Sequence, residues 1–334
     1  MFAIVELNNQ YEYYKIEYKM GKTIIPICFA FDNNLILPAC ICLTSLLMNA
    51  HEDTFYDIFI LYSRDVELNT QELDRLPDHY KNCSISYRPI NNVFKSAYQT
   101  RGITTPAYFR LLIPEIISEY DKVLYSDVDV IFREDLSKFY NVDIDDFYFG
   151  AVDVGVEARK DIKEYVEQEI KLDASNGFFY SGNLIMNLKL LRKDKMLDKF
   201  MLLSKNDYRF QDMDIINIAC NGKIKSISPE FCLTNYLYEL LLNRPNEYSA
   251  VDIRSDVDNI MKKGVVHYNG IKPWAAWCIN HDIWWYYYRK SLFYDEKFCY
   301  NFYSINLNES EQWTLWKRIK HVIRFFKNRN VKKW

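Results

Sequence analysis

Apolar segments of strand length alternate with helical segments through the N-terminal part of the chain. Residues 24–31 (IIPICFAF) are a continuous apolar run, residues 56–62 (YDIFILY) are apolar except for Asp57, and residues 83–89 (CSISYRP) alternate between apolar and polar side chains. Between these runs, an apolar stretch opened by Pro38 and an amphipathic segment at 68–76 predict helices. Strands and helices in this order, joined by short polar segments, are typical of a mostly parallel sheet with helices on both faces.

The same alternation continues along the chain. The remaining predicted elements are helices at 107–117, 189–205 and 212–222 and strands at 123–125, 148–152 and 183–188. The last of these helices is expected to end at Gly222, because glycine is the usual residue just past a helix end.

The domain organisation is expected to be simple, because neither an internal repeat nor a low-complexity linker interrupts the chain. We predict one catalytic domain at 22–280, preceded by an extension at 1–21. Residues 281–334 are predicted to form a helical, aromatic and basic C-terminal region.

Composition excludes some classes of function. The 334 residues include only 9 glycines, with neither G-x-G-x-x-G nor a P-loop, which argues against a glycine-lined phosphate site. The eight cysteines lie mostly among apolar neighbours without a C-x-x-C, as expected for buried thiols in a reducing cytosol. No run approaches the roughly 20 apolar residues of a membrane span, and residues 1–20 lack the features of a secretory signal.

Two aspartates one residue apart, Asp127 and Asp129, follow the predicted strand at 123–125. In sheets of this kind, ligands collect at the carboxyl ends of strands. Two carboxylates in such a place repel each other and lose hydration unless a cation lies between them. A divalent ion that prefers oxygen ligands, manganese or magnesium, resolves that conflict. A structural turn remains the alternative on spacing alone.

The D-x-D spacing alone is a weak signal, because the chain contains it four times. The other three pairs are Asp143/Asp145, Asp212/Asp214 and Asp256/Asp258. A solvated turn, the first turn of a helix and a loop or helix start account for them in that order. None of the three directly follows a strongly apolar strand.

Seven separated motifs resemble, in order and spacing, the enzymes of glycosyltransferase family 8. The motifs are FAFDNN, YFRLL, VLYSDVDV, GAVD, YSGNLIMNL, FQDMDIIN and VVHYNGIKPW, and the resemblance spans about residues 24–274. The resemblance implies a Rossmann-like GT-A fold with a mixed, mostly parallel sheet and a helical C-terminal tail. It also implies transfer of a hexose, with retention of configuration, from UDP-glucose or UDP-galactose to a cell-surface glycan or glycolipid such as a lipopolysaccharide core.

The resemblance assigns roles to individual residues. It implies that Asp127, Asp129 and His267 bind Mn²⁺ or Mg²⁺. The residues expected to contact the donor nucleotide are Ala30, Asp32, Asn34, Asp127, Val128, Gly270 and Lys272, with Gly270 and Lys272 at the diphosphate. The residues expected to contact the sugar or act in catalysis are Arg110, Asp153, Gln211 and Asp212. A lone histidine among apolar residues is more often a core residue, so the ligand role of His267 depends on the surrounding HYNGIKPW.

Three positions depart from the family pattern. Tyr180 stands where asparagine is expected to bond the donor sugar, which leaves sugar selectivity open. Met213 replaces the glutamine of the common D-Q-D, and a thioether can serve as neither nucleophile nor strong hydrogen-bond partner. Leu35 replaces an often aromatic residue, so weaker uridine stacking is expected. We therefore favour a front-face mechanism over double displacement.

The C-terminal segment combines an apolar helical stripe with basic residues. Residues 312–334 contain eight Lys or Arg and no Asp or Glu. One interpretation is a helix packed on the domain or on a protein partner; the other is an interfacial helix on an anionic membrane, with Trp and Phe inserted. Nucleic-acid binding is not expected, because the rest of the chain is acidic.

The predicted function is therefore a cytoplasmic, membrane-peripheral, metal-dependent hexosyltransferase. A sugar nucleotidyltransferase is an alternative, but it ordinarily uses a glycine-rich phosphate loop. A non-catalytic carbohydrate- or membrane-binding protein on a degenerate scaffold is the other alternative. It has no need for Asp127, Asp129, His267 and Lys272 together.

Overall fold

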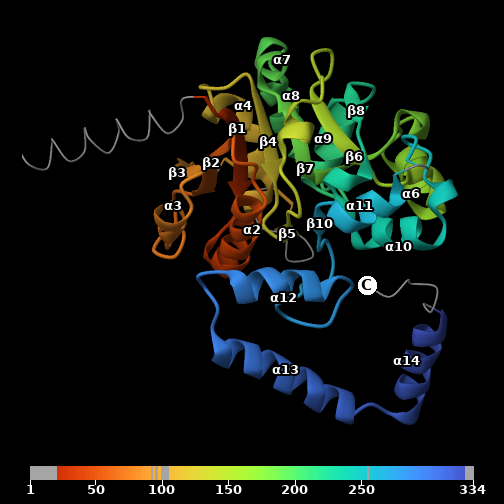
Figure 1. Ribbon diagram of the computed structural model, residues 1–334. Coiled ribbons are helices and arrows are strands. Elements are labelled where there is room, and N and C mark those ends of the chain that lie inside the picture. The colour runs from red at the N-terminus through yellow and green to blue at the C-terminus, as the bar shows by residue number, and fades with distance from the viewer. Residues whose placement is uncertain (1–20, 92, 95–96, 99–104, 254–255, 328–334) are drawn as a thin grey trace, which may run out of the picture.

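A seven-stranded, mostly parallel sheet forms the centre of the protein. The computed structural model describes residues 21–91, 93–94, 97–98, 105–253 and 256–327. The strand order is β3-β2-β1-β4-β7-β6-β8, and β7 runs antiparallel to both of its neighbours (Figure 1). The strands are β1 Thr23–Ala30, β2 Thr54–Ser63, β3 Cys83–Ile90, β4 Lys122–Ser126, β6 Phe149–Asp153, β7 Phe179–Asn187 and β8 Ile224–Ser226. This arrangement confirms the predicted fold class.

The apolar runs of the sequence form the central strands because these strands are buried on both faces. In β1 every residue from Ile25 to Ala30 is buried, and in β4 every residue from Val123 to Ser126. The α-helices that surround the sheet or lie C-terminal to it are α2 Ile36–Met48, α3 Arg75–His79, α4 Ile113–Ile116, α5 Ser137–Tyr140, α6 Lys160–Glu164, α7 Leu188–Lys193, α8 Met196–Leu203, α9 Asp212–Ala219, α10 Asn235–Asn243, α11 Val257–Lys263, α12 His281–Lys290, α13 Glu296–Glu311 and α14 Leu315–Lys327.

A second, three-stranded sheet brings distant parts of the chain together beside β4. Its strands are β5 Val130–Ile131, β10 Val266–His267 and β9 Leu233–Thr234, with β10 in the middle. His267 pairs with Val130, so a residue near the end of the family motifs lies directly beside the segment that follows Asp127.

Three predicted helices differ from the observed elements. Residues 68–70 have no regular secondary structure and residues 71–74 form turns before the short helix α3, because the Asn69 side chain accepts the backbone N–H of Gln71 and competes with helix formation. Residues Thr105–Leu112 form a 3₁₀ helix before α4, where Pro114 has no N–H to donate. The helix predicted at 189–205 is divided into α7 and α8 at Lys195, whose φ is +52°.

The predicted helix end at Gly222 and the predicted buried thiols agree more closely with the structure. Helix α9 ends at Ala219, three residues before the predicted Gly222, and Gly222 has the positive φ of +71° expected near a helix end. All eight cysteines are free thiols, and six of them are buried.

Helix α12 packs on the main body of the protein. Trp284 and Trp285 are buried in a cluster that also contains Ile41 of α2, Ile131 of β5 and Val266 of β10. Side chains on both sides of residue 280 therefore share one apolar cluster. The domain boundary at 280 stays a prediction.

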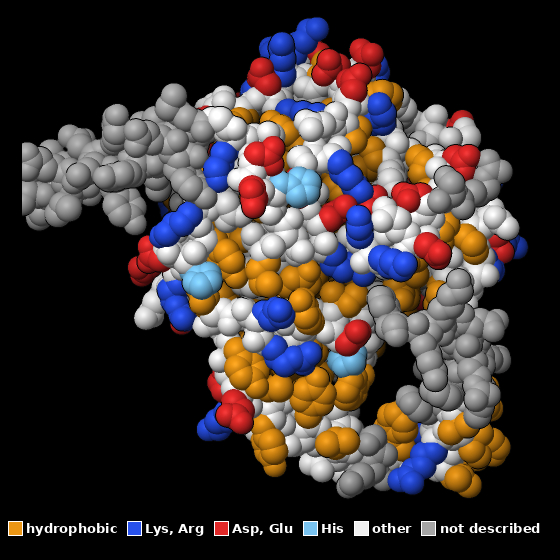
Figure 2. Space-filling view, viewed as in Figure 1, with side chains coloured by type: hydrophobic (Ala, Val, Ile, Leu, Met, Phe, Trp, Pro, Cys, Tyr) orange, Lys and Arg blue, Asp and Glu red, His pale blue; other side chains and the backbone are white. Residues whose placement is uncertain are grey.

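Helix α13 packs on α12 through Phe302, whereas α14 extends away from the main body (Figure 1), and Figure 2 shows hydrophobic and basic side chains together in the region of α14. On α14, Leu315 and Trp316 are each 73% exposed, and Val322 and Ile323 are about half exposed. These side chains do not pack on the domain. Within the described ranges, every helix is too short or too polar to cross a membrane.

Candidate active site

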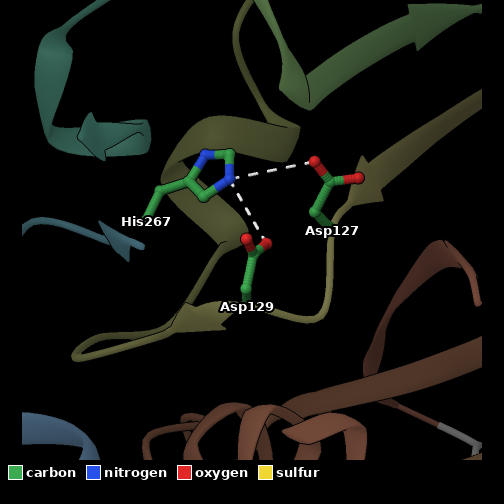
Figure 3. Close-up of side chains that lie close together, drawn as sticks. All are labelled: Asp127, Asp129 and His267. Carbon is green, nitrogen blue, oxygen red and sulfur yellow. Dashed lines mark ion pairs between the residues drawn. The ribbon is translucent and has the colours of Figure 1, made fainter. Parts of the chain in front are cut away.

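Three potential metal ligands converge at the carboxyl end of β4. Asp127 follows β4, Asp129 precedes β5, and His267 ends β10. One ligand atom from each lies within 4.8 Å of the others. His267 Nε2 is 3.3 Å from Asp129 Oδ1 and 3.8 Å from Asp127 Oδ2, and the three side chains point toward one another in Figure 3. Two carboxylates and an imidazole suit Mn²⁺, and the carboxylates suit Mg²⁺.

The backbone of β7 closes one side of this cluster at Gly182. The Gly182 carbonyl accepts the N–H of Asp127 at 2.8 Å. A methyl group added at Gly182 would lie 2.2 Å from His267 Cε1 and 2.8 Å from Asp127 Oδ2. Any side chain here would therefore displace two of the three potential ligands. Sequence reasoning gave Gly182 no role, although glycine is scarce enough in this chain to draw attention to each one.

Arg110 joins two acidic residues beneath the cluster. Its Nη2 donates to Asp127 Oδ1 at 2.8 Å, and its Nε lies 3.2 Å from Asp212 Oδ2. Burial would lower the pKa of Arg110, but these two carboxylates raise it above its usual value. Arg110 is 4% exposed and also donates to the carbonyls of Ala107 and Ser181, so its position is fixed.

Tyr125 and Ser181 complete this network, and sequence reasoning assigned a role to neither. The Tyr125 hydroxyl donates to Asp127 Oδ1 at 2.9 Å, and its ring lies 4.5 Å from the Arg110 guanidinium. The Ser181 hydroxyl donates to Asp212 Oδ2 at 2.7 Å. Burial raises the pKa of Asp212.

The acidic pair at the start of α9 is more than a pair of helix-capping charges. Asp212 and Asp214 lie in the first turn, as predicted, but both are buried. Asp214 accepts the hydroxyl of Tyr165 at 2.7 Å and the N–H of Phe210 at 2.6 Å. The predicted first-turn position is confirmed, but tertiary partners also hold both side chains in the interior.

Lys272 and Cys232 each contact one of the potential ligands. Lys272 Nζ donates to Asp129 Oδ2 and to the Tyr268 carbonyl. Cys232 Sγ lies 3.4 Å from His267 Nδ1. Burial would lower the pKa of His267, but Asp129 and Cys232 raise it to about 10. Burial would raise the pKa of Asp129, but His267 and Lys272 lower it well below its usual range.

A cavity of about 270 Å³ lies where β1 and β2 end. Its lining includes Asp32, Asn34 and Tyr62. Asp32 Oδ1 accepts the N–H of Asn34 at 2.9 Å, which shapes the turn after β1, while Ala30 is the last residue of that strand. The three residues predicted to bind uridine thus lie in or beside one cavity.

The other predicted donor contacts lie on both sides of the acidic cluster. Val128, between Asp127 and Asp129, is 4% exposed and packs in the core. Gly270 is exposed, and a methyl group added there would meet nothing closer than Asn235 Nδ2 at 3.7 Å.

The residues predicted to contact the sugar differ in their surroundings. Gln211 has a φ of +53°, its Nε2 donates to the Tyr98 carbonyl, and its buried Oε1 has no partner within the described part of the chain. Both carboxylate oxygens of Asp153 instead accept backbone N–H groups, from Gly155, Val156 and Phe178. Asp153 lies at the edge of a second cavity, of about 210 Å³, at the ends of β6 and β8.

The departures from the family pattern also have defined positions. The Tyr180 hydroxyl accepts the Thr234 hydroxyl at 3.1 Å and is buried in the core. Met213 is partly buried against the same core and carries no polar group. The structure therefore offers no substitute for the missing asparagine and glutamine side chains at these two positions.

Comparisons with known proteins agree with the site. The family model described as glycosyl transferase family 8 matches residues 26–278. The chain belongs to glycosyltransferase family 8. Among curated proteins of known name, the lipopolysaccharide 1,2-glucosyltransferase of Escherichia coli is 24% identical over 258 residues, which cover 75% of this chain and 73% of that protein.

Solved structures show the same GT-A fold. The galactosyltransferase LgtC, solved with donor and acceptor sugar analogues, superposes with a TM-score of 0.65 at 24% identity over 82% of this chain and 98% of its own. The bifunctional glycosyltransferase WbbM superposes with a TM-score of 0.67 at 21% identity, over 81% of this chain and 50% of its own length. These likenesses establish the fold of this family 8 member.

Proposed function

We propose that this glycosyltransferase moves glucose or galactose from a UDP-sugar, with a divalent metal, to a cell-surface glycan such as a lipopolysaccharide core. One observation carries the proposal. Asp127, Asp129 and His267 converge at the end of β4, next to the cavity at the ends of β1 and β2. A nucleoside in that cavity would place its diphosphate at the three side chains.

The order of the strands supports a linear arrangement of donor and acceptor. Strands β2, β1, β4, β6 and β8 are parallel, so their carboxyl ends share one edge of the sheet. The nucleoside cavity, the acidic cluster and the cavity beside Asp153 follow one another along this edge. The donor sugar would lie between the last two, near Gln211 and Asp212, where an acceptor hydroxyl can approach it.

The chemistry follows from the side chains that the site contains. A bound divalent ion would stabilise the negative charge that develops on the departing diphosphate. Arg110 holds Asp127 in place, and it also neutralises Asp212, which leaves that carboxylate poorly suited to act as a nucleophile. Met213 offers no nucleophilic atom either. The acceptor hydroxyl would attack the anomeric carbon on the face from which UDP leaves, and the departing phosphate oxygen would take its proton.

The exposed face of α14 supports membrane association at the cytoplasmic surface. Leu315 and Trp316 project into solvent, and the exposed Lys317, Arg318 and Lys320 lie beside them. Apolar and basic side chains together favour the interface of an anionic membrane, with about 1 kcal/mol from each basic residue. Deleting residues 309–334 should abolish co-sedimentation with phosphatidylglycerol vesicles. Undiminished vesicle binding by the truncated protein would exclude this role for the tail.

A donor screen tests the enzymatic proposal. Purified protein is incubated with a panel of UDP-sugars, with and without Mn²⁺, and released UDP is measured. We expect slow hydrolysis of UDP-glucose or UDP-galactose that requires the metal. Release from none of the donors, together with no binding of UDP in the presence of Mn²⁺, would contradict the proposal.

A further inference from the structure

The two aspartates of the acidic cluster are paired with cations of very different mobility. Arg110, on Asp127, is 4% exposed and held by two backbone carbonyls and two carboxylates. The Lys272 side chain, on Asp129, is 34% exposed and has two partners, Asp129 and the Tyr268 carbonyl. A lysine ammonium is a point charge on a flexible stem and can exchange partners, whereas a forked, buried guanidinium cannot do so easily.

The position of Lys272 divides the oxygens of Asp129 between two tasks. Oδ1 faces His267 Nε2 at 3.3 Å, in the centre of the potential metal site. Oδ2 accepts the Lys272 ammonium. While Lys272 stays there, Asp129 can offer only one oxygen to a cation. The positive charge of the ammonium on the other oxygen also repels that cation.

We propose that Lys272 is a mobile counter-ion that couples metal binding to diphosphate binding. When the diphosphate of a donor arrives, the ammonium leaves Asp129 Oδ2 for the phosphate oxygens. Asp129 is then free to bind the cation with both oxygens and with its full charge. This inference rests on the proposed function, because it needs a metal and a nucleoside diphosphate at the same site.

The consequence is a difference between metal binding with and without nucleotide. Lys272 competes with the cation when no diphosphate is present and assists the complex when one is present. Coupling between two ligands is reciprocal, so the nucleotide strengthens metal binding by the same factor as the metal strengthens nucleotide binding. Lys272 contributes part of this coupling factor, and that part must be lost when the charge of Lys272 is removed.

The test compares the wild-type protein with Lys272→Met in Mn²⁺ titrations followed by electron paramagnetic resonance, first alone and then with saturating UDP. Without UDP, we expect the variant to bind Mn²⁺ about 5–150-fold more tightly, the usual range of such couplings. Its affinity for UDP should fall, and the factor by which UDP strengthens Mn²⁺ binding should shrink at least about fivefold. Lys272→Arg retains the charge and should bind Mn²⁺ without UDP as weakly as the wild type, but the factor by which UDP strengthens Mn²⁺ binding should shrink, because a guanidinium exchanges partners less easily.

Two controls separate a specific exchange from other effects. Lys263→Met removes a positive charge from the exposed end of α11, without a contact to Asp129, and should leave Mn²⁺ binding unchanged. Circular dichroism melts show whether Lys272→Met is folded.

Each remaining outcome of the titration decides against the exchange. Weaker Mn²⁺ binding by Lys272→Met without UDP would mean that the lysine positions Asp129 instead of competing with the cation. Unchanged Mn²⁺ binding, with a loss of UDP affinity alone, would mean that it is a phosphate contact and nothing more. If the wild-type protein binds neither Mn²⁺ nor UDP, the proposed function itself fails, which is a separate result.

Discussion

Replacing Gly182 by alanine should remove the proposed metal site while keeping the fold. The added methyl group would lie 2.2 Å from His267 Cε1, whereas carbon atoms in contact lie about 3.5–4.0 Å apart. His267 or β7 must therefore move by more than about 1 Å. Metal–ligand distances tolerate only about 0.2 Å, so the imidazole can no longer bind a cation held by Asp127 and Asp129. We expect Mn²⁺ affinity to fall at least about 100-fold, beyond the usual effect of changing a residue that only supports a metal ligand.

The effect on stability should be much smaller. Overpacking by one methyl group costs typically about 1–3 kcal/mol, and alanine offsets about 0.5–1 kcal/mol of that because it is less flexible than glycine when unfolded. Gly150→Ala on β6 is a matched control, because its methyl group would meet the side chains of Ile144 and Ile185 at 3.2–3.4 Å and no ligand atom. Both variants are compared by urea unfolding and by Mn²⁺ titration with electron paramagnetic resonance.

Two outcomes of the comparison between Gly182→Ala and Gly150→Ala would contradict this reasoning. If Gly182→Ala binds Mn²⁺ as tightly as the wild-type protein, then β7 does not limit the position of His267, and the reasoning from the close approach is wrong. If Gly150→Ala loses Mn²⁺ binding to the same extent, the loss comes from general disturbance of the sheet.

Three further changes test other contacts. Cys232→Ala removes the partner of His267 Nδ1 and should weaken Mn²⁺ binding about 10-fold, with partial recovery in Cys232→Ser, measured by the same titration. Burial and the neighbouring Glu230 raise the pKa of Glu134 to about 7, so the folded state holds a proton that the unfolded state releases near pH 4.5. This proton makes the free energy of unfolding fall as pH rises from about 4.5 to 7, and Glu134→Gln should remove roughly 1–3 kcal/mol of that fall. Urea titrations at pH 5 and 8 measure it, and an equal change in the free energy of unfolding for both proteins would contradict this. Arg110→Met leaves two carboxylates without their cation and should lower the free energy of unfolding by about 3–5 kcal/mol, and a loss below about 1 kcal/mol would mean that water replaces the guanidinium.

The strands of the main sheet were predictable because burial on both faces leaves a continuous apolar run. Strands β2 and β4 contain the runs at 56–62 and 123–125, and β1 contains all of the run at 24–31 except Phe31. The small sheet was not predictable in the same way. Its strands each contain two residues, too few for any period to be visible, and they pair because tertiary packing brings them together.

The candidate site was also predictable only in part. The identity of Asp127, Asp129 and His267 could be inferred from the order of the family motifs, and the structure places the three side chains together. The contacts that hold them could not be inferred. The ion pair between Arg110 and Asp212, and the contact between Cys232 and His267, join residues far apart in sequence, and no local pattern specifies such pairs.

The scarcity of glycine acquires a physical meaning in this site. A glycine-rich loop binds phosphate through backbone N–H groups, which requires several residues without side chains. The proposed site has no need of such a loop, because a divalent ion and the ammonium of Lys272 would supply the positive charge. The glycine that does matter, Gly182, serves the ligands themselves, since its missing side chain leaves the room that His267 and Asp127 occupy. The proposed site, in which cations would stabilise the phosphate, would depend on close packing around those cations, and a single methyl group at Gly182 is a more severe test of the proposal than a change in the cavity at the ends of β1 and β2.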